Sequence, residues 1–152
     1  MNELYQRVPI NEQSLVRVFH KRFGVAINDK PTIVEDSIRT LRVRLITEEY
    51  KELMKSLGVI VDVVVNQETK KVSLVDLADA MGDTDYVVKG TAVSYGIDME
   101  PFFVEIHRSN MSKGDPEPIV RADGKILKAK NFQPPNLGPI LEAQMRVDED
   151  GS

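Results

Sequence analysis

The sequence contains no cysteine and only two histidines in 152 residues. Without cysteine, the chain cannot form disulfides, thiolate metal sites or a cysteine nucleophile. The two histidines, His20 and His107, leave little scope for a histidine-built zinc site. We therefore expect any metal ion to be bound by oxygen ligands, which favours Mg²⁺ or Mn²⁺.

Long apolar runs are also missing. No stretch approaches the roughly 20 apolar residues needed to span a bilayer, and the first ten residues, MNELYQRVPI, lack the apolar centre of a signal peptide. The net charge of −4 argues against a general nucleic-acid or acidic-membrane binder. We expect a cytoplasmic protein with neither nucleic acid nor membrane as a partner.

The composition, 41% apolar and 29% charged, is that of an ordinary globular protein, and the length suits one domain over residues 1–152. Periodicity, capping residues and glycines predict a helical core over about 11–114. Its four helices are expected at 11–23, 33–57, 73–96 and 98–114. The β-branched run 59–65 predicts either a short strand pair with KKVSL or a distorted helical extension.

Residues 115–145 differ from this core. Five of the eight prolines lie in 114–140, which has no helical period but keeps enough apolar residues to dock. We expect an ordered, extended C-terminal arm. The fold class is therefore all-α, and because so few helices cannot bury their apolar stripes in one small monomer, we expect a bundle completed by oligomerisation, as a dimer or tetramer.

Acidic residues interrupt the apolar face of the helix predicted at 33–57. Its stripe begins at Ile38 and continues, in steps of three and four residues, into Glu48, Glu49 and Glu52. A carboxylate on an inward face is costly unless it is paired or bound to a metal. The alternative is a solvated acidic face that pairs with neighbouring lysines and arginines.

The helix predicted at 73–96 repeats this arrangement, with Asp76, Asp79 and Asp83 at spacings of three and four. If the two helices pack together, four or five carboxylates meet. Two unit charges 4 Å apart repel by roughly 4 kcal/mol at an effective dielectric of 20, so such a cluster needs compensation. Divalent cations supply it, and hard oxygen ligands suit Mg²⁺.

RLITEEYKEL, followed after about 25 residues by LADAMGDTDYVVKGTAVSYGID, resembles the all-α nucleoside triphosphate pyrophosphohydrolases. This MazG-like group includes the phosphoribosyl-ATP pyrophosphohydrolases and the dimeric dUTPases, and its hallmark is a Glu-Glu-x-x-Glu helix paired with a Glu-x-x-Asp helix. EIHRSNMSK and RADGKILKAKNFQPPNL are similar to the Asn-x-x-Lys and tail segments of its phage and bacterial branch. The resemblance covers roughly residues 15–137. It implies a MazG-like bundle and hydrolysis between the α- and β-phosphates, which gives a nucleoside monophosphate and pyrophosphate.

One position departs from the family pattern. Asp83 falls on the aspartate of the second helix, but the residue three positions earlier is Ala80. Asp79 would take the place of the glutamate, at a spacing of four rather than three, which keeps both acids on one helix face. The pair Asp76 and Asp79 also fits the spacing, but it leaves the downstream match out of register.

The resemblance implies roles for individual residues. Glu48, Glu49 and Glu52 are the candidate catalytic residues, and Glu48 either binds metal or orients the attacking water. The candidate ligands of two or more Mg²⁺ or Mn²⁺ ions are Glu49, Glu52, Asp79 and Asp83. The candidate phosphate-binding residues are Asn110, Lys113 and Lys128.

Phe19 and His20 are candidates for contact with the base, although packing is the simpler explanation of both. The main expectation is a metal-dependent hydrolase of (d)NTPs that controls a nucleotide pool. The alternatives are a dUTP-specific diphosphatase of the same fold and a helical module that binds nucleotide without turnover.

Overall fold

The computed structural model describes residues 10–146. Residues 1–9, which carry most of the segment considered for a signal peptide, and residues 147–152 lie outside this range. Within it, no helix is both long and apolar enough to cross a membrane.

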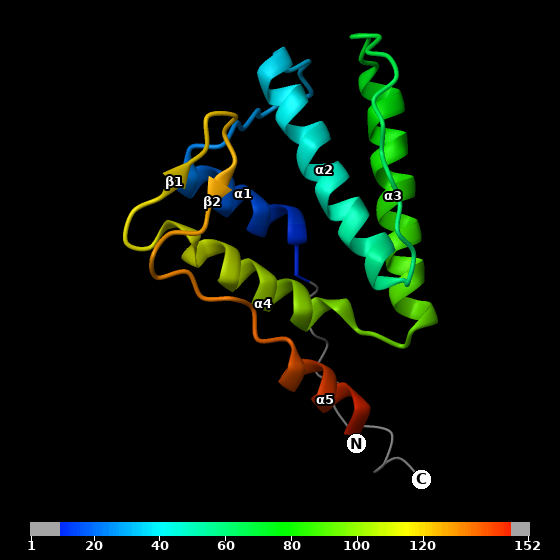
Figure 1. The fold of residues 1–152 in the computed structure, drawn as a ribbon, viewed down its shortest axis with the longest axis vertical. Helices are drawn as coiled ribbons and strands as arrows, with labels where there is room; N and C mark the ends of the chain where they lie inside the picture. The colour runs from blue at the N-terminus through cyan, green and yellow to red at the C-terminus, as the bar shows by residue number, and fades with distance from the viewer. Residues whose placement is uncertain (1–9, 147–152) are drawn as a thin grey trace. The chain divides into compact units, whose positions relative to one another are not determined.

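Helices dominate the described residues, which confirms the all-α prediction (Figure 1). The helices are α1 (Glu12–Phe23), α2 (Asp36–Ser56), α3 (Leu74–Ser94), α4 (Met99–Met111) and α5 (Gly138–Arg146). A 3₁₀ turn, η1 (Ser112–Gly114), extends α4, and β1 (Ile119–Val120) pairs with β2 (Ile126–Leu127).

The helix ends follow the local chemistry of the sequence. Ser73 caps α3, because its Oγ accepts a hydrogen bond from the backbone N of Asp76 at 3.2 Å. Asp98 caps α4 in the same way, through a 3.1 Å bond from the backbone N of Glu100. Gly24 ends α1 at φ +65°, in the left-handed region that favours glycine.

Two parts of the chain differ from the sequence-based expectation. Residues 59–73 form neither a strand pair nor a helical extension; they have no regular structure, and Ile60 and Val64 expose 89% and 72% of their surface. The arm is ordered but not wholly extended, because it contains the β1–β2 hairpin and α5. The short apolar runs that begin at Ile126 and Ile140 are too brief to show a period, although both contribute to regular structure.

The described chain divides into two compact units. The first contains residues 10–27, 86–119 and 126–146, and the second contains residues 28–85 and 120–125.

In the first unit, α1 packs against α4, and Phe23 and Phe102 are buried. The ring of Phe23 lies directly against Gly114 of η1, and only glycine fits there, because a Cβ at this position would lie 2.3 Å from the ring. The arm then returns along α4. Ser109 donates to the carbonyl of Gln133 at 2.7 Å.

The arm is bound to α4 at two further points. The backbone N of Asn136 donates to the carboxylate of Glu105 at 2.8 Å. Gln144 on α5 brackets the α4 cap, accepting from the backbone N of Asp98 at 3.0 Å and donating to its carbonyl at 2.9 Å. These bonds hold the arm in place without a large apolar core.

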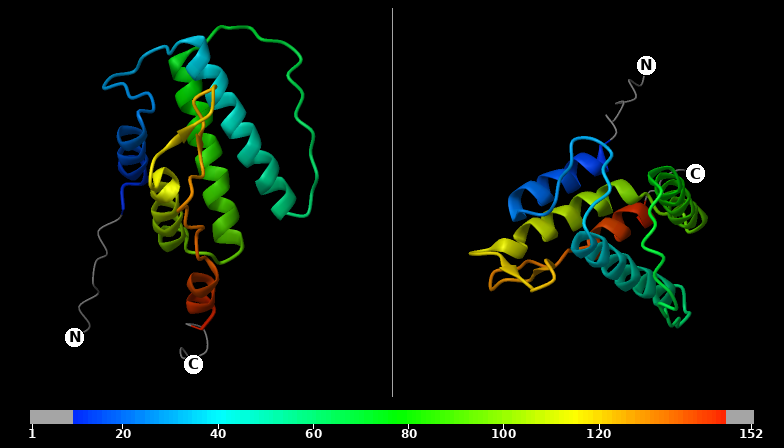
Figure 2. Two further views of the ribbon diagram at one scale, coloured as in Figure 1. Left: turned by 60° about the vertical axis from the view of Figure 1, so that its left-hand side comes forward. Right: turned by 90° about the horizontal axis from the view of Figure 1, so that it is seen from above.

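In the second unit, α2 and the first half of α3 run in the same direction (Figures 1 and 2). Residues 57–73 return from the end of α2 to the start of α3. Because of this return, α3 starts near the level at which α2 starts, which sets the positions of the acidic residues along the two helices.

Candidate functional site

The acidic residues of α2 fall into two classes. Glu48 is partly buried and forms an ion pair with Lys125. Glu49 and Glu52 are exposed, and neither has an ion-pair partner among the described residues. The carboxylates of Glu49 and Glu52 are therefore available to a cation.

On α3, Asp79 and Asp83 lie four residues apart, one helical turn along the same face. Both side chains are exposed, and within residues 10–146 neither carries an ion pair. Asp76 lies in the first turn of α3, where its negative charge suits the helix N-terminus.

The acids of α2 and α3 do not meet within one chain. No three acidic or histidine side chains among residues 10–146 are grouped so that they could hold a metal ion. The direction of the helices gives the reason. Glu49 and Glu52 lie in the second half of α2, whereas Asp79 and Asp83 lie in the first half of α3. Because the two helices run in the same direction, the two pairs are offset along their length.

The end of the β1–β2 hairpin contacts α2 through residues 121–125, which we call the hairpin tip. Arg121 and Lys125 close the tip, because the backbone N of Arg121 donates to the carbonyl of Lys125 at 2.9 Å. Gly124 lies at φ +91°, and a Cβ at this position would lie 3.2 Å from the side chain of Leu41. The tip therefore rests directly on α2.

Asp123 holds the hairpin tip together and ties it to α2. Its carboxylate accepts from Arg121 Nε and Nη2 at 2.8 and 2.7 Å, from the backbone N of Lys125 at 3.3 Å, and from Arg44 of α2. The Arg121 hydrogen bonds are the main reason that the pKa of Asp123 lies well below its usual range. The group stays ionised and the tip stays anchored in ordinary buffers.

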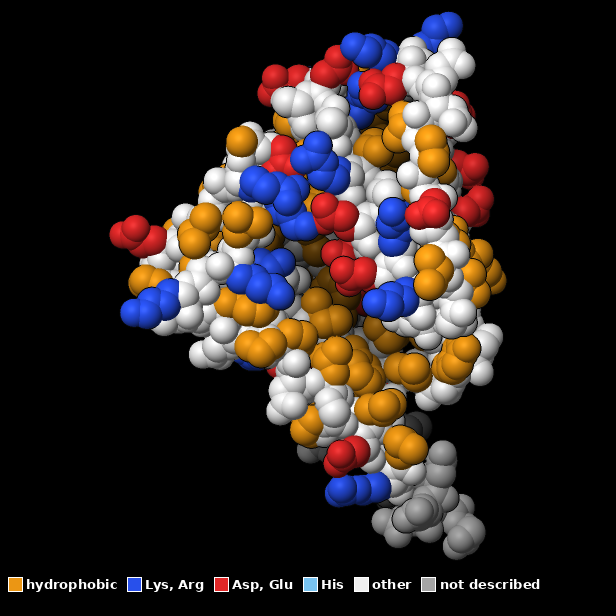
Figure 3. All heavy atoms as spheres, viewed as in Figure 1, with side chains coloured by type: hydrophobic (Ala, Val, Ile, Leu, Met, Phe, Trp, Pro, Cys, Tyr) orange, Lys and Arg blue, Asp and Glu red, His pale blue; other side chains and the backbone are white. Residues whose placement is uncertain are grey.

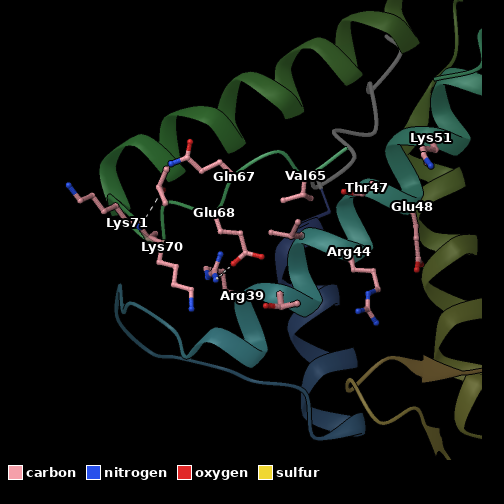
Figure 4. Close-up of a pocket in the computed structure, with 14 residues that line it drawn as sticks. Arg39, Arg44, Thr47, Glu48, Lys51, Val65, Gln67, Glu68, Lys70 and Lys71 are labelled. Atoms are coloured by element: carbon pink, nitrogen blue, oxygen red, sulfur yellow. Dashed lines mark hydrogen bonds and ion pairs between the residues drawn. The ribbon is translucent and has the colours of Figure 1, made fainter. Parts of the chain in front are cut away.

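This anchoring places Lys125 against Glu48, one turn of α2 beyond Arg44. Figure 4 shows Arg44 and Glu48 pointing from α2 toward the same side. The side chain of Lys125 is 29% exposed and that of Glu48 is 36% exposed. The Lys125 hydrogen bond lowers the pKa of Glu48, against the opposing effect of burial. Glu48 is therefore a carboxylate with a fixed cationic partner.

A groove of about 560 Å³ lies between α2 and residues 65–72 (Figure 4). Its basic lining residues are Arg39, Arg44, Lys51, Lys70 and Lys71. Much of this charge is already paired, because Arg39 bonds Glu68 at 3.3 Å, Lys70 lies 3.6 Å from Asp36, and Arg44 bonds Asp123. Of the predicted site residues, only Glu48 lines it.

The predicted phosphate-binding residues belong to the other unit. Asn110 lies in the last turn of α4 and Lys113 in η1, one turn apart. The backbone N of Ala129 donates to the carbonyl of Lys113 at 3.0 Å, so the segment that carries Lys128 runs beside η1. The Lys128 ammonium lies 4.8 Å from the centre of the Phe132 ring.

The two residues predicted to contact a base both have partners within their own unit. The Phe19 ring lies 4.6 Å from that of Phe23. His20 places Nδ1 2.9 Å from the carbonyl of Ala26, just beyond the end of α1. A role in base contact stays a prediction for both.

The partnership of Lys125 with Glu48 and the place of Asp123 were not predicted from the sequence. A signal was present, because Asp123-Gly124 lies between two apolar pairs, and Asp-Gly so flanked is typical of a hairpin turn. No sequence pattern shows which helix a hairpin will contact.

The donor set suits a hard divalent cation. Glu49, Glu52, Asp79 and Asp83 supply only carboxylate oxygen, the ligand type that Mg²⁺ and Mn²⁺ prefer. These are also the acids of the predicted site that have no cationic partner among the described residues. The chemistry of the set fits a metal ion, although the described residues of one chain do not bring the four carboxylates together.

Comparison with known proteins agrees with the fold and the acidic segments. The model of the phosphoribosyl-ATP pyrophosphohydrolase family matches residues 16–110, which include the acids of both α2 and α3. No curated protein matches the sequence. Among solved structures, a "putative NTP pyrophosphohydrolase" from Exiguobacterium sp. 255-15 is similar, with a TM-score of 0.67 and 24% identity over 95% of this chain and 99% of the other. At this identity the similarity is one of fold.

Proposed function

The chain belongs to the phosphoribosyl-ATP pyrophosphohydrolase family, and from this premise we propose that it hydrolyses nucleoside triphosphates to nucleoside monophosphates and pyrophosphate in a metal-dependent reaction. The observation that carries the proposal is the family match across both acidic helices. The unpaired state of four of their carboxylates supports it.

Glu49, Glu52, Asp79 and Asp83 would hold Mg²⁺ or Mn²⁺, with two or more ions in a site. When bound, these ions offset the negative charge of a triphosphate and polarise its phosphoryl oxygens. Glu48 directly precedes Glu49 on α2 and accepts a hydrogen bond from Lys125. Without cysteine the chain has no thiol nucleophile, which suits direct attack by water.

The outer phosphates need cationic or amide donors that the acidic helices lack. Asn110 and Lys113, one turn apart at the end of α4, are suited to this role, with Lys128 on the adjacent segment. Lysine binds phosphate as a point charge, and the asparagine amide adds directed hydrogen bonds.

Pyrophosphate release from a panel of ribo- and deoxynucleoside triphosphates tests the proposal. We expect release with Mg²⁺ or Mn²⁺, complete loss with EDTA, and recovery when the metal is restored. The monophosphate product separates cleavage between the α- and β-phosphates from loss of the terminal phosphate. Absence of turnover with every triphosphate and both metals refutes the enzyme and favours a non-catalytic nucleotide-binding module; activity on dUTP alone identifies a dUTP-specific diphosphatase.

We also propose that copies of the chain associate through α3. This helix has no buried residue along its 21 positions. In the view of Figure 3, residues 57–73 pass in front of α3, and apolar side chains reach the surface on that side. Tyr86, Val87 and Val93 expose 81%, 63% and 80% of their surface. At about 25 cal/mol per Å², burying the apolar surface of α3 would stabilise association by several kcal/mol. Association through α3 would also bring the exposed Asp79 and Asp83 close to acidic residues of another copy.

Sedimentation equilibrium measures the association. We expect the wild-type chain to form a dimer or tetramer, and Val87→Glu to shift it toward the monomer at micromolar concentration, because a buried unpaired charge opposes association. Val18→Glu, at an exposed position of α1, is the matched control and should leave the assembly intact. If Val18→Glu dissociates the assembly and Val87→Glu does not, α3 is not the interface.

A further inference from the structure

Glu48 differs from the other acids of the proposed site because a cation is already fixed against it. Lys125 contacts its carboxylate, whereas Glu49, Glu52, Asp79 and Asp83 have no such partner in the described chain. The contact joins residues 77 positions apart in sequence, so only the placement of the hairpin tip produces it.

The tip is anchored independently of this contact. Asp123 accepts four hydrogen bonds, one of them from Arg44 of α2. Gly124 lies against Leu41, one turn before Arg44. The Lys125 ammonium therefore stays beside Glu48 because the turn that carries it is held on α2 by other bonds. A surface lysine without such support would sample many rotamers, at a cost in side-chain entropy for each contact.

We propose that Lys125 is a positioning residue that holds Glu48 out of the metal-ligand set. A carboxylate that is paired with a fixed ammonium is a poor metal ligand, because the ammonium repels a divalent cation that approaches the same carboxylate. The oxygen of Glu48 that does not face Lys125 can still accept a hydrogen bond, and so can orient a water molecule. This resolves the two roles that the sequence left open for Glu48, and it rests on the proposed function.

Mn²⁺ binding, measured by electron paramagnetic resonance without nucleotide, tests the inference apart from turnover. We expect Lys125→Met to bind Mn²⁺ about tenfold more tightly than the wild type, the size of effect that a unit charge beside a divalent ion has in water-like surroundings. Pyrophosphate release should fall about tenfold in kcat with little change in KM, because Glu48 then becomes a ligand. Lys125→Arg should stay close to the wild type in both measurements.

Two further variants separate positioning from general damage. Glu48→Gln in the Lys125→Met background should return Mn²⁺ affinity to within about twofold of the wild type while turnover stays low, because both charges of the pair are then removed and no extra carboxylate ligand is present. Lys30→Met, an exposed lysine of the same unit, is the charge-matched control and should change neither quantity.

Tighter Mn²⁺ binding together with slower turnover is a result that loss of structure does not produce, since misfolding weakens both. Weaker or unchanged Mn²⁺ binding in Lys125→Met overturns the inference, as does a wild-type chain that binds no Mn²⁺. If the Mn²⁺ shift is found and the wild type releases no pyrophosphate from any triphosphate, the proposed function fails while the placement of Glu48 stands.

Discussion

Glu52→Gln is expected to abolish pyrophosphate release while the fold is retained. The substitution keeps the size of the side chain and removes its charge, so a cation loses one of its anionic ligands. Glu52 is exposed and has no ion-pair partner in the described chain, so no folded-state bond is lost with the carboxylate. The hydrogen bond from Ser56 Oγ goes to the backbone carbonyl of Glu52, at 2.9 Å, and survives the change.

We expect kcat/KM to fall roughly 100-fold or more, which corresponds to about 2.7 kcal/mol of transition-state stabilisation. Circular dichroism and the melting temperature should match those of the wild type. Glu117→Gln is the control, because Glu117 is an exposed acid of the arm that lies outside the proposed site. An active Glu52→Gln enzyme would show that the metal site has been assigned to the wrong face of α2.

Much of the fold could be predicted because its signals are local. Ser73 and Asp98 cap helices through atoms only two or three residues away, and Gly24 ends α1 through its own backbone angle. Such signals do not depend on what the rest of the chain does. The predicted helices therefore lie close to the observed ones.

The contacts of the arm could not be predicted in this way. Lys125 contacts Glu48 across 77 positions, and the sequence predicts the hairpin tip that carries Lys125 only as a turn. Nothing in the sequence near Lys125 indicates a partner for it, whereas in the fold its ammonium pairs with the carboxylate of Glu48. Long-range electrostatic partners are set by packing, which periodicity does not encode.

The proposed acidic site could be predicted in part: the grouping of acids on each helix was predicted, but the arrangement of the two helices was not. Helical spacing correctly places Asp79 and Asp83 one turn apart on α3, and it groups Glu49 with Glu52 on α2. Spacing does not give the direction of one helix relative to the next, and the return of residues 57–73 makes α2 and α3 run in the same direction. Helical spacing therefore does not predict how the carboxylates of α2 would come together with those of α3.

The register of α3 leads to the second large expected effect, that Asp79→Asn should be far more harmful than Asp76→Asn. Asp79 and Asp83 share a face at a spacing of four, with Ala80 at the position three before Asp83. If Asp79 is the ligand that replaces a glutamate at position 80, loss of its charge should lower kcat/KM by about 100-fold. Mn²⁺ affinity should fall with it.

Asp76→Asn should change activity by no more than about threefold. The carboxylate of Asp76 lies in the first turn of α3, where a negative charge contributes only about 0.3–1 kcal/mol to helix stability. Its backbone N, which donates to Ser73, is unchanged by the substitution, so the cap remains. The reverse order of the two variants would place the ligands at Asp76 and Asp79, one turn earlier on α3. Ala80→Glu in the Asp79→Asn background decides the point independently, since recovery of Mn²⁺ binding would show that position 80 faces the same ion as Asp83.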